Sequence, residues 1–96
     1  MLTISNQPNF TGRARFVGEC TQIPKAKVLK ILEDARLDKK TYDVFISDEA
    51  IMAKRNAFDP IAPNCTTMIN PKRDSIEYAI KFTMETFDNI IKHNNL

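Results

Sequence analysis

The sequence predicts an α+β fold: a small two-layer sandwich in which about three strands form a sheet and two main helices, residues 24–36 and 75–93, pack on one face of it. Two observations support this class. Apolar residues recur at helical spacing in both of those segments, whereas β-branched and aromatic residues gather in short runs outside them. The order along the chain is strand, helix, strand, an irregular or short element, strand and long helix.

The clearest element is the helix predicted over 75–93. Its apolar residues recur three and four positions apart, at Ile76, Ala79, Ile80, Thr83, Met84, Phe87, Ile90 and Ile91. Asp74 or Ser75 can cap its first turn, and Pro71 stands outside the helix, where it cannot interrupt it. These features predict a helix with one buried stripe.

The second helix is predicted over 24–36. Pro24 is harmless in a first turn because the amide it lacks would have no partner there. Val28, Ile31 and Leu32 share one face with Ala35, so this helix is also amphipathic.

Strands are predicted at 12–19, 41–47 and 65–70. The second of these has three consecutive apolar residues, which indicates a central strand covered to some degree on both faces. Residues 48–55 permit two interpretations. Ser47 before two acidic residues is typical of a helix start, and the apolar residues after it suit a hairpin partner for the preceding strand. We favour a short helix.

Length and composition indicate one folded domain spanning residues 1–96, with residues 1–11 as a loosely ordered N-terminal segment. The start of the chain lacks the apolar run of a secretory signal, and no apolar run reaches the roughly 20 residues that span a bilayer. Cys20 and Cys65 stand alone rather than in a CxxC pair. We therefore expect a cytoplasmic protein with two free thiols and no membrane partner.

Catalysis has little support in the sequence. A thiol enzyme would need Cys65 with the sole histidine, His93, as its base, but His93 falls in the last turn of the terminal helix with no group to orient it. Acidic residues near the central strand, a possible pair for a hydrolase, are Asp43, Asp48, Glu49 and Asp59, and turn or helix-start positions explain them as well. With only two glycines there is no phosphate-binding loop. We expect no enzyme, no catalytic residue, no metal and no cofactor.

The favoured function is a small non-catalytic protein-interaction domain. Tyr78 and Phe82 lie one turn apart on the terminal helix, outside its apolar stripe, and Glu85 continues that outer line. Either these aromatics tuck under neighbouring segments, or they form an exposed contact patch for another protein or for a second copy of this chain. Phe58 and Ile61, in the segment before the third strand, are further predicted contact residues.

The alternative function is binding to nucleic acid or to the ribosome through Arg13, Arg15, Lys72 and Arg73. The element order is similar to that of ribosome hibernation factors and other small RNA-facing α+β domains, and this resemblance implies ribosome binding. Those factors carry rows of basic residues on both helices, whereas the terminal helix here is mixed in charge. Protein interaction therefore stays the favoured interpretation.

Overall fold

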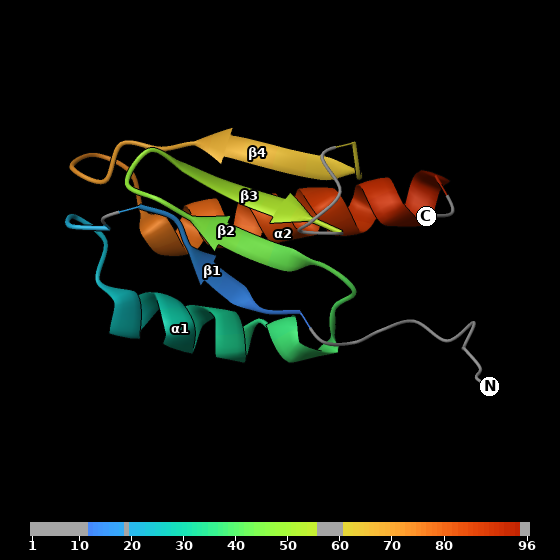
Figure 1. Ribbon diagram of the computed structural model, residues 1–96, viewed down its shortest axis with the longest axis horizontal. Coiled ribbons are helices and arrows are strands. Elements are labelled where there is room, and N and C mark those ends of the chain that lie inside the picture. Colours follow the sequence, from blue (N-terminus) through green and yellow to red (C-terminus); the bar gives the residue numbers. More distant parts are fainter. Residues whose placement is uncertain (1–11, 19, 56–60, 95–96) are drawn as a thin grey trace.

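The computed structural model describes residues 12–18, 20–55 and 61–94, and shows an α+β fold with a four-stranded sheet and two helices (Figure 1). The elements in chain order are β1 (Ala14–Phe16), α1 (Lys25–Asp34), the short 3-10 helix η1 (Leu37–Lys39), β2 (Asp43–Ile46), β3 (Ala50–Lys54), β4 (Asn64–Met68) and α2 (Ile76–Asn94). The expected number of about three strands was one too low. The loosely ordered segment predicted over 1–11 lies outside the described residues.

The strands follow one another across the sheet in the order β1-β2-β3-β4. β1 and β2 are parallel and are joined by the α1 crossover, whereas β2–β3 and β3–β4 are antiparallel. One row across the sheet runs from Arg15 through Phe45 and Met52 to Thr66. β2 lies inside the sheet, as predicted, and one of its faces is buried while the other is half-buried.

The extra strand is β3, where we had favoured a short helix. Ser47 Oγ accepts hydrogen bonds from the amides of Glu49 and Ala50, at 3.2 and 3.1 Å, as the cap of a helix would. Here the same local bonds close a hairpin, because Ser47 N also donates to the carbonyl of Ala50 at 3.0 Å. Ile51 is buried and Met52 half-buried in alternation, which is the period of a strand.

Both helices begin at identifiable residues. Pro24 occupies the N-cap position of α1, and Arg36, with a φ of 62°, turns the chain after that helix ends. α1 is therefore shorter than the predicted 24–36. α2 begins after Ser75, whose Oγ accepts the amide hydrogen of Tyr78 at 3.2 Å, as expected for an N-cap serine.

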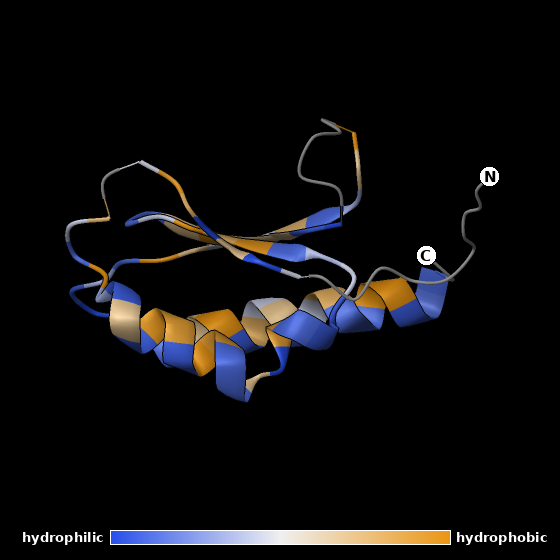
Figure 2. Ribbon diagram, turned by 60° about the horizontal axis from the view of Figure 1, so that its bottom comes forward, coloured by the Kyte–Doolittle hydropathy of each residue, from blue (hydrophilic) through white to orange (hydrophobic). Residues whose placement is uncertain are grey.

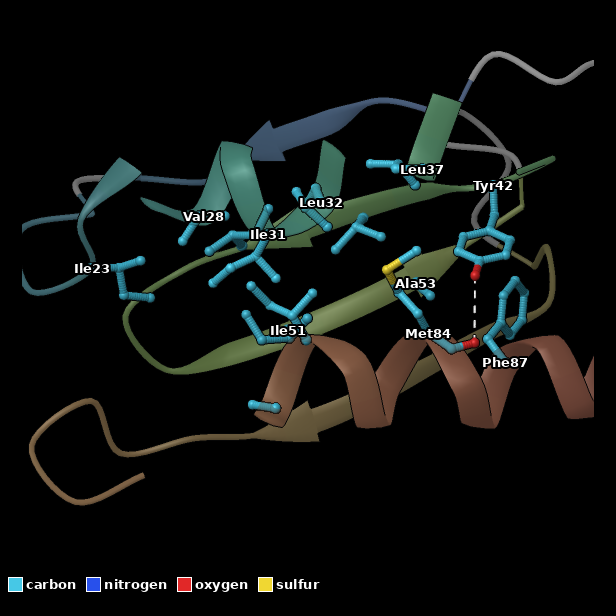
Figure 3. Close-up of a cluster of buried hydrophobic side chains, with 14 residues drawn as sticks. Ile23, Val28, Ile31, Leu32, Leu37, Tyr42, Ile51, Ala53, Met84 and Phe87 are labelled. Carbon is cyan, nitrogen blue, oxygen red and sulfur yellow. Dashed lines mark hydrogen bonds between the residues drawn. The ribbon is translucent and has the colours of Figure 1, made fainter. Parts of the chain in front are cut away.

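The two helices lie on one side of the sheet (Figure 2). Between the layers lies a cluster of apolar side chains, which come from α1, η1, α2 and the inner face of the strands (Figure 3). Its fully buried members include Val28 from α1, Val44 and Ile46 from β2, Ile51 from β3, and Phe87 from α2. Alternation along β2 and β3 places these side chains on the helix side of the sheet.

Tyr42 anchors the far part of α2 to the start of β2. Its Oη lies 3.4 Å from the carbonyl oxygen of Met84, and its ring meets Phe87 edge-on at 4.9 Å between centroids (Figure 3). The same Oη lies 2.8 Å from Asp88 Oδ1. Lys40 Nζ binds the other oxygen of Asp88 at 2.9 Å. Burial, and then the hydrogen bond and charge of Asp88, raise the pKa of Tyr42 well above its ordinary value.

Candidate protein-interaction site

A hollow of about 380 Å³ opens between the C-terminal end of β4 and the first turns of α2. Its strand side consists of residues 67–69, and its helix side consists of residues 73–75 with Tyr78, Ala79 and Phe82. Of the elements that line it, β4 is the edge strand on the side of the sheet away from α1 (Figure 1). We call this hollow, together with the outer edge of β4, the β4–α2 face.

Tyr78 and Phe82 form a stacked pair on this face. Their ring centroids are 6.0 Å apart and the planes differ by 16°. The two side chains are 69% and 48% exposed. Met68, on the β4 strand that borders the hollow, is 72% exposed, but it follows Thr67, which faces α2, so its side chain alternates to the opposite face of the sheet. Two large aromatic side chains thus face water beside one concavity, an arrangement that marks a contact surface more often than single scattered residues do.

The position of the pair follows from the residues beside it in α2. Ala79 and Thr83, each next to one of the aromatics, are buried. Thr83 Oγ1 lies 2.7 Å from Thr67 Oγ1 on β4, and also 2.7 Å from the carbonyl oxygen of Ala79. With that side of the helix held against the strand, Tyr78 and Phe82 are turned outward beyond the edge of the sheet.

The edge of β4 offers backbone groups beside the hollow. Ile69 N donates to the carbonyl of Glu49 at 2.9 Å, and Arg55 N donates to the carbonyl of Pro63 at 3.2 Å. In this register, the backbone groups of the odd-numbered residues of β4 are the ones that form hydrogen bonds with β3. The amides and carbonyls of Asn64, Thr66 and Met68 then point away from the sheet. Within the described part of the chain, β4 is an outermost strand.

The other predicted contact residues lie away from the hollow. Glu85 is exposed three residues after Phe82 on α2. Ile61 is 88% exposed, but it precedes β4 and so belongs to the opposite end of that strand from Met68. Phe58 lies outside the described residues.

The four basic residues of the alternative do not form one patch. Arg13 and Arg15 belong to the β1 side of the sheet, whereas Lys72 and Arg73 follow β4 at the opposite edge. Arg15 Nε is bound to Asp43 Oδ2 at 2.6 Å, and its guanidinium lies 6.0 Å from the centre of the Phe45 ring. This arginine is engaged within the sheet's own surface.

Cys65, Asp48 and His93 were considered for catalysis, and each lies in surroundings typical of a structural residue. Burial raises the pKa of the Cys65 thiol, which lowers the fraction of reactive thiolate at neutral pH. Asp48 accepts hydrogen bonds from the amide and hydroxyl of Thr21, both at 3.0 Å, and from the amide of Gln22 at 3.1 Å. Partial desolvation opposes these bonds, but they prevail and lower the pKa of Asp48. His93 is exposed near the end of α2.

No three metal-binding side chains (His, Cys, Asp or Glu) gather closely enough to hold a metal ion in residues 12–18, 20–55 and 61–94. Over the same residues, no helix is both long enough and apolar enough to cross a bilayer. Compared with known proteins, the chain matches no family model, no curated protein and no solved structure.

Met68 and the open backbone of Thr66 were missed by sequence reasoning. The available signal was the composition of residues 64–68, a strand without a single charged side chain. That signal alone does not separate an interior strand from an open edge, because the distinction depends on the order of strands in the sheet.

Proposed function

We propose that this chain is a non-catalytic protein-interaction domain that binds through the β4–α2 face, where the partner adds an extended segment to the edge of β4. The observation that carries the proposal is the exposed, stacked pair Tyr78–Phe82 at the mouth of a hollow beside the open edge of β4. Large apolar side chains of this kind dominate the energy of protein contacts.

The chemistry of the face suits an extended segment. Main-chain groups of Asn64, Thr66 and Met68 can extend the ladder of the sheet, and alternate side chains of an added strand would point into the hollow. Main-chain bonding supplies affinity that is independent of the partner's sequence, whereas the hollow selects for an apolar side chain.

The proposal excludes a catalytic role for the two cysteines. Cys20 and Cys65 are free thiols, which suits a reducing cytoplasm, the location we propose. The raised pKa of Cys65 opposes nucleophilic activity, and the exposed position of His93 gives that imidazole no fixed orientation toward a substrate.

Nucleic-acid or ribosome binding remains the alternative. It would use Arg13 and Arg15 at one edge of the sheet together with Lys72 and Arg73 at the other. Such binding weakens steeply as salt is raised, because it depends on release of counterions from phosphates. A contact made by Tyr78 and Phe82 would respond weakly to salt.

Affinity capture tests the proposal. The full chain is immobilised and exposed to lysate of the source cells, with and without nuclease, beside the Tyr78→Ser/Phe82→Ser double variant and a Leu29→Ser control. Leu29 on α1 is 49% exposed, which matches Phe82 but lies on the other helix. We expect a protein retained by the wild type and the control and lost from the double variant.

Two results would reject the proposal. One is recovery of the same proteins by all three chains. The other is recovery of ribosomal components that disappear with nuclease or moderate salt, which would support the basic residues instead. Circular dichroism of each variant verifies the fold, and Thr66→Pro provides a second disruption should the double variant unfold, because the amide of Thr66 takes no part in the β3–β4 ladder.

A further inference from the structure

We infer that the partner at the β4–α2 face is a second copy of this chain. Two copies pair their β4 strands antiparallel about a two-fold axis, which joins two four-stranded sheets into one of eight strands with the α2 helices side by side beneath it. The inference rests on the proposed function, which itself requires only that some partner strand be added to β4.

The two outermost strands of the described sheet differ in how well they are protected from pairing. β1 has only three residues and carries Arg15. β4 has five residues in unbroken register, with no charge and no proline. Short length, charges, prolines and bulges are the devices that keep an open edge from pairing. β4 has none of them, so its sequence favours an added strand.

The position of α2 favours a second copy over a bare peptide. α2 packs on β3 and β4 alike, so its axis lies between these strands. Neighbouring strands are about 4.8 Å apart, so this axis lies about 5 Å from a two-fold axis placed midway between two paired β4 strands. The two α2 axes then lie about 10 Å apart, within the range for packed helices. A bound peptide strand without a helix of its own would extend the sheet but would leave Phe82 on α2 exposed to water.

The flank of α2 that would meet its copy carries no charge. Ser75 and Phe82 both line the hollow, and Thr86 and Asn89 follow Phe82 at helical spacing on the same flank. Next to a two-fold axis a charge faces the same charge of the other copy, so the residues nearest the axis should be uncharged. This flank satisfies that condition.

Charged side chains of α2 lie elsewhere. Glu77 and Lys81 form an ion pair of 2.8 Å, and Asp88 is bound to Lys40 and Tyr42 on the α1 side. Glu85 lies at the solvent-side rim, about 60° around the helix from the direction of Phe82. The charges of the β4–α2 face are Arg73 and Asp74, which line the hollow just before the first turn of α2.

The exposed apolar area is large enough to contribute to a dimer. With about 200 Å² for each large side chain, the exposed fractions of Met68, Tyr78 and Phe82 leave roughly 380 Å² open to water. A standard interface buries about 800 Å² on each partner. These three side chains would supply nearly half of it, and the β4 strand with the rest of the α2 flank adjoins them.

The mass of the purified full chain in solution tests the inference. Light scattering or sedimentation should give twice the chain mass of 11.0 kDa, with dissociation on dilution. Thr66→Pro and the Tyr78→Ser/Phe82→Ser double variant should be monomeric at concentrations where the matched controls Thr66→Val and Leu29→Ser remain dimeric.

Hydrogen exchange of the wild type tests the same inference without substitution. The amides of Thr66 and Met68 point outward, so they become hydrogen-bonded only in the dimer. Their exchange should be slower by roughly tenfold or more at high protein concentration than at low protein concentration. The amide of Thr67, which pairs with β3, serves as the internal reference.

A monomer at every concentration overturns the inference, as does a dimer that survives both Thr66→Pro and the double variant. Combined with affinity capture, the result separates the two proposals. A monomer that still captures a protein through Tyr78 and Phe82 leaves the proposed function standing with a different partner. A monomer that captures nothing rejects both.

Discussion

Thr83 Oγ1 on α2 lies 2.7 Å from Thr67 Oγ1 on β4, so a hydrogen bond between two hydroxyl groups joins the long helix to the outer strand. Thr83 is fully buried, which makes this bond the polar link in an otherwise apolar helix–sheet contact. Because this bond holds the Thr83 side of α2 against β4, the adjacent Phe82 side chain points outward.

Replacement of Thr83 by valine preserves its shape and removes the hydroxyl. The half-buried Thr67 hydroxyl then loses its partner, and we expect the free energy of unfolding to fall by about 1–2 kcal/mol. Guanidinium denaturation measures the change. Thr86→Val, on the same helix and half-buried, should change stability by less than about 0.5 kcal/mol. Equal losses in the two variants would contradict the role assigned to this bond.

Ile51 and Met52 test the assignment of β3 as a strand. Ile51 is fully buried on the helix side, and Met52 is half-buried on the opposite face. Ile51→Ala should lower the free energy of unfolding by about 3 kcal/mol, and Met52→Ala by less than half as much. A short helix over these residues would not alternate in this way, so comparable losses would argue against the strand.

Because of Tyr42, the free energy of unfolding should depend on pH in the alkaline range. Burial raises its folded pKa above the ordinary value of 10.0, so the unfolded chain releases the proton first. The stability contributed by this group is complete below pH 10.0 and is lost as the pH rises. At neutral pH, Tyr42→Phe should lower stability by about 1 kcal/mol through loss of the bond to Asp88.

Denaturation curves of the wild type and Tyr42→Phe, recorded from about pH 9 to about pH 11, test the sign. The wild type should lose stability faster, so the gap between the two chains should narrow and then reverse. A gap that remains constant over this range would show that Tyr42 titrates in the folded state as it does in the unfolded chain.

Cys65 should behave as a structural thiol. Because burial raises its pKa above 9.0, alkylation by iodoacetamide in a Cys20→Ala background should reach half its limiting rate above that pH. Mass spectrometry of the alkylated chain follows the rate. Half-maximal reaction below about pH 8 would indicate an activated thiol and revive the enzyme hypothesis.

Elements with a long local period were predictable. α2 was expected over 75–93 and spans Ile76–Asn94, because apolar residues three and four positions apart leave few alternatives to a helix. For β3, a strand was the less favoured of the two interpretations of residues 48–55. The bonds from Ser47 Oγ to the amides of Glu49 and Ala50 serve a helix cap and a hairpin turn equally well, so local chemistry does not separate them.

The candidate site was predictable only in part. The spacing of Tyr78 and Phe82 placed them outside the apolar stripe of α2, but their exposure depended on which segments pack nearby. Met68 and the open backbone of Thr66 depend on β4 being outermost in the sheet, a property of strand order. Arg13 and Arg15 looked equivalent to Lys72 and Arg73 as basic pairs, and the sheet separates them.

By itself, the sequence determined the class of the fold and the inner face of both helices, because side-chain periodicity acts between neighbours along one chain. The tertiary structure alone decided that Ala50–Lys54 forms a strand, that β4 lies at an edge, and that the Tyr78–Phe82 pair stands beside it. These features depend on how whole strands and helices pair and pack against one another, and the local residue pattern does not determine that arrangement.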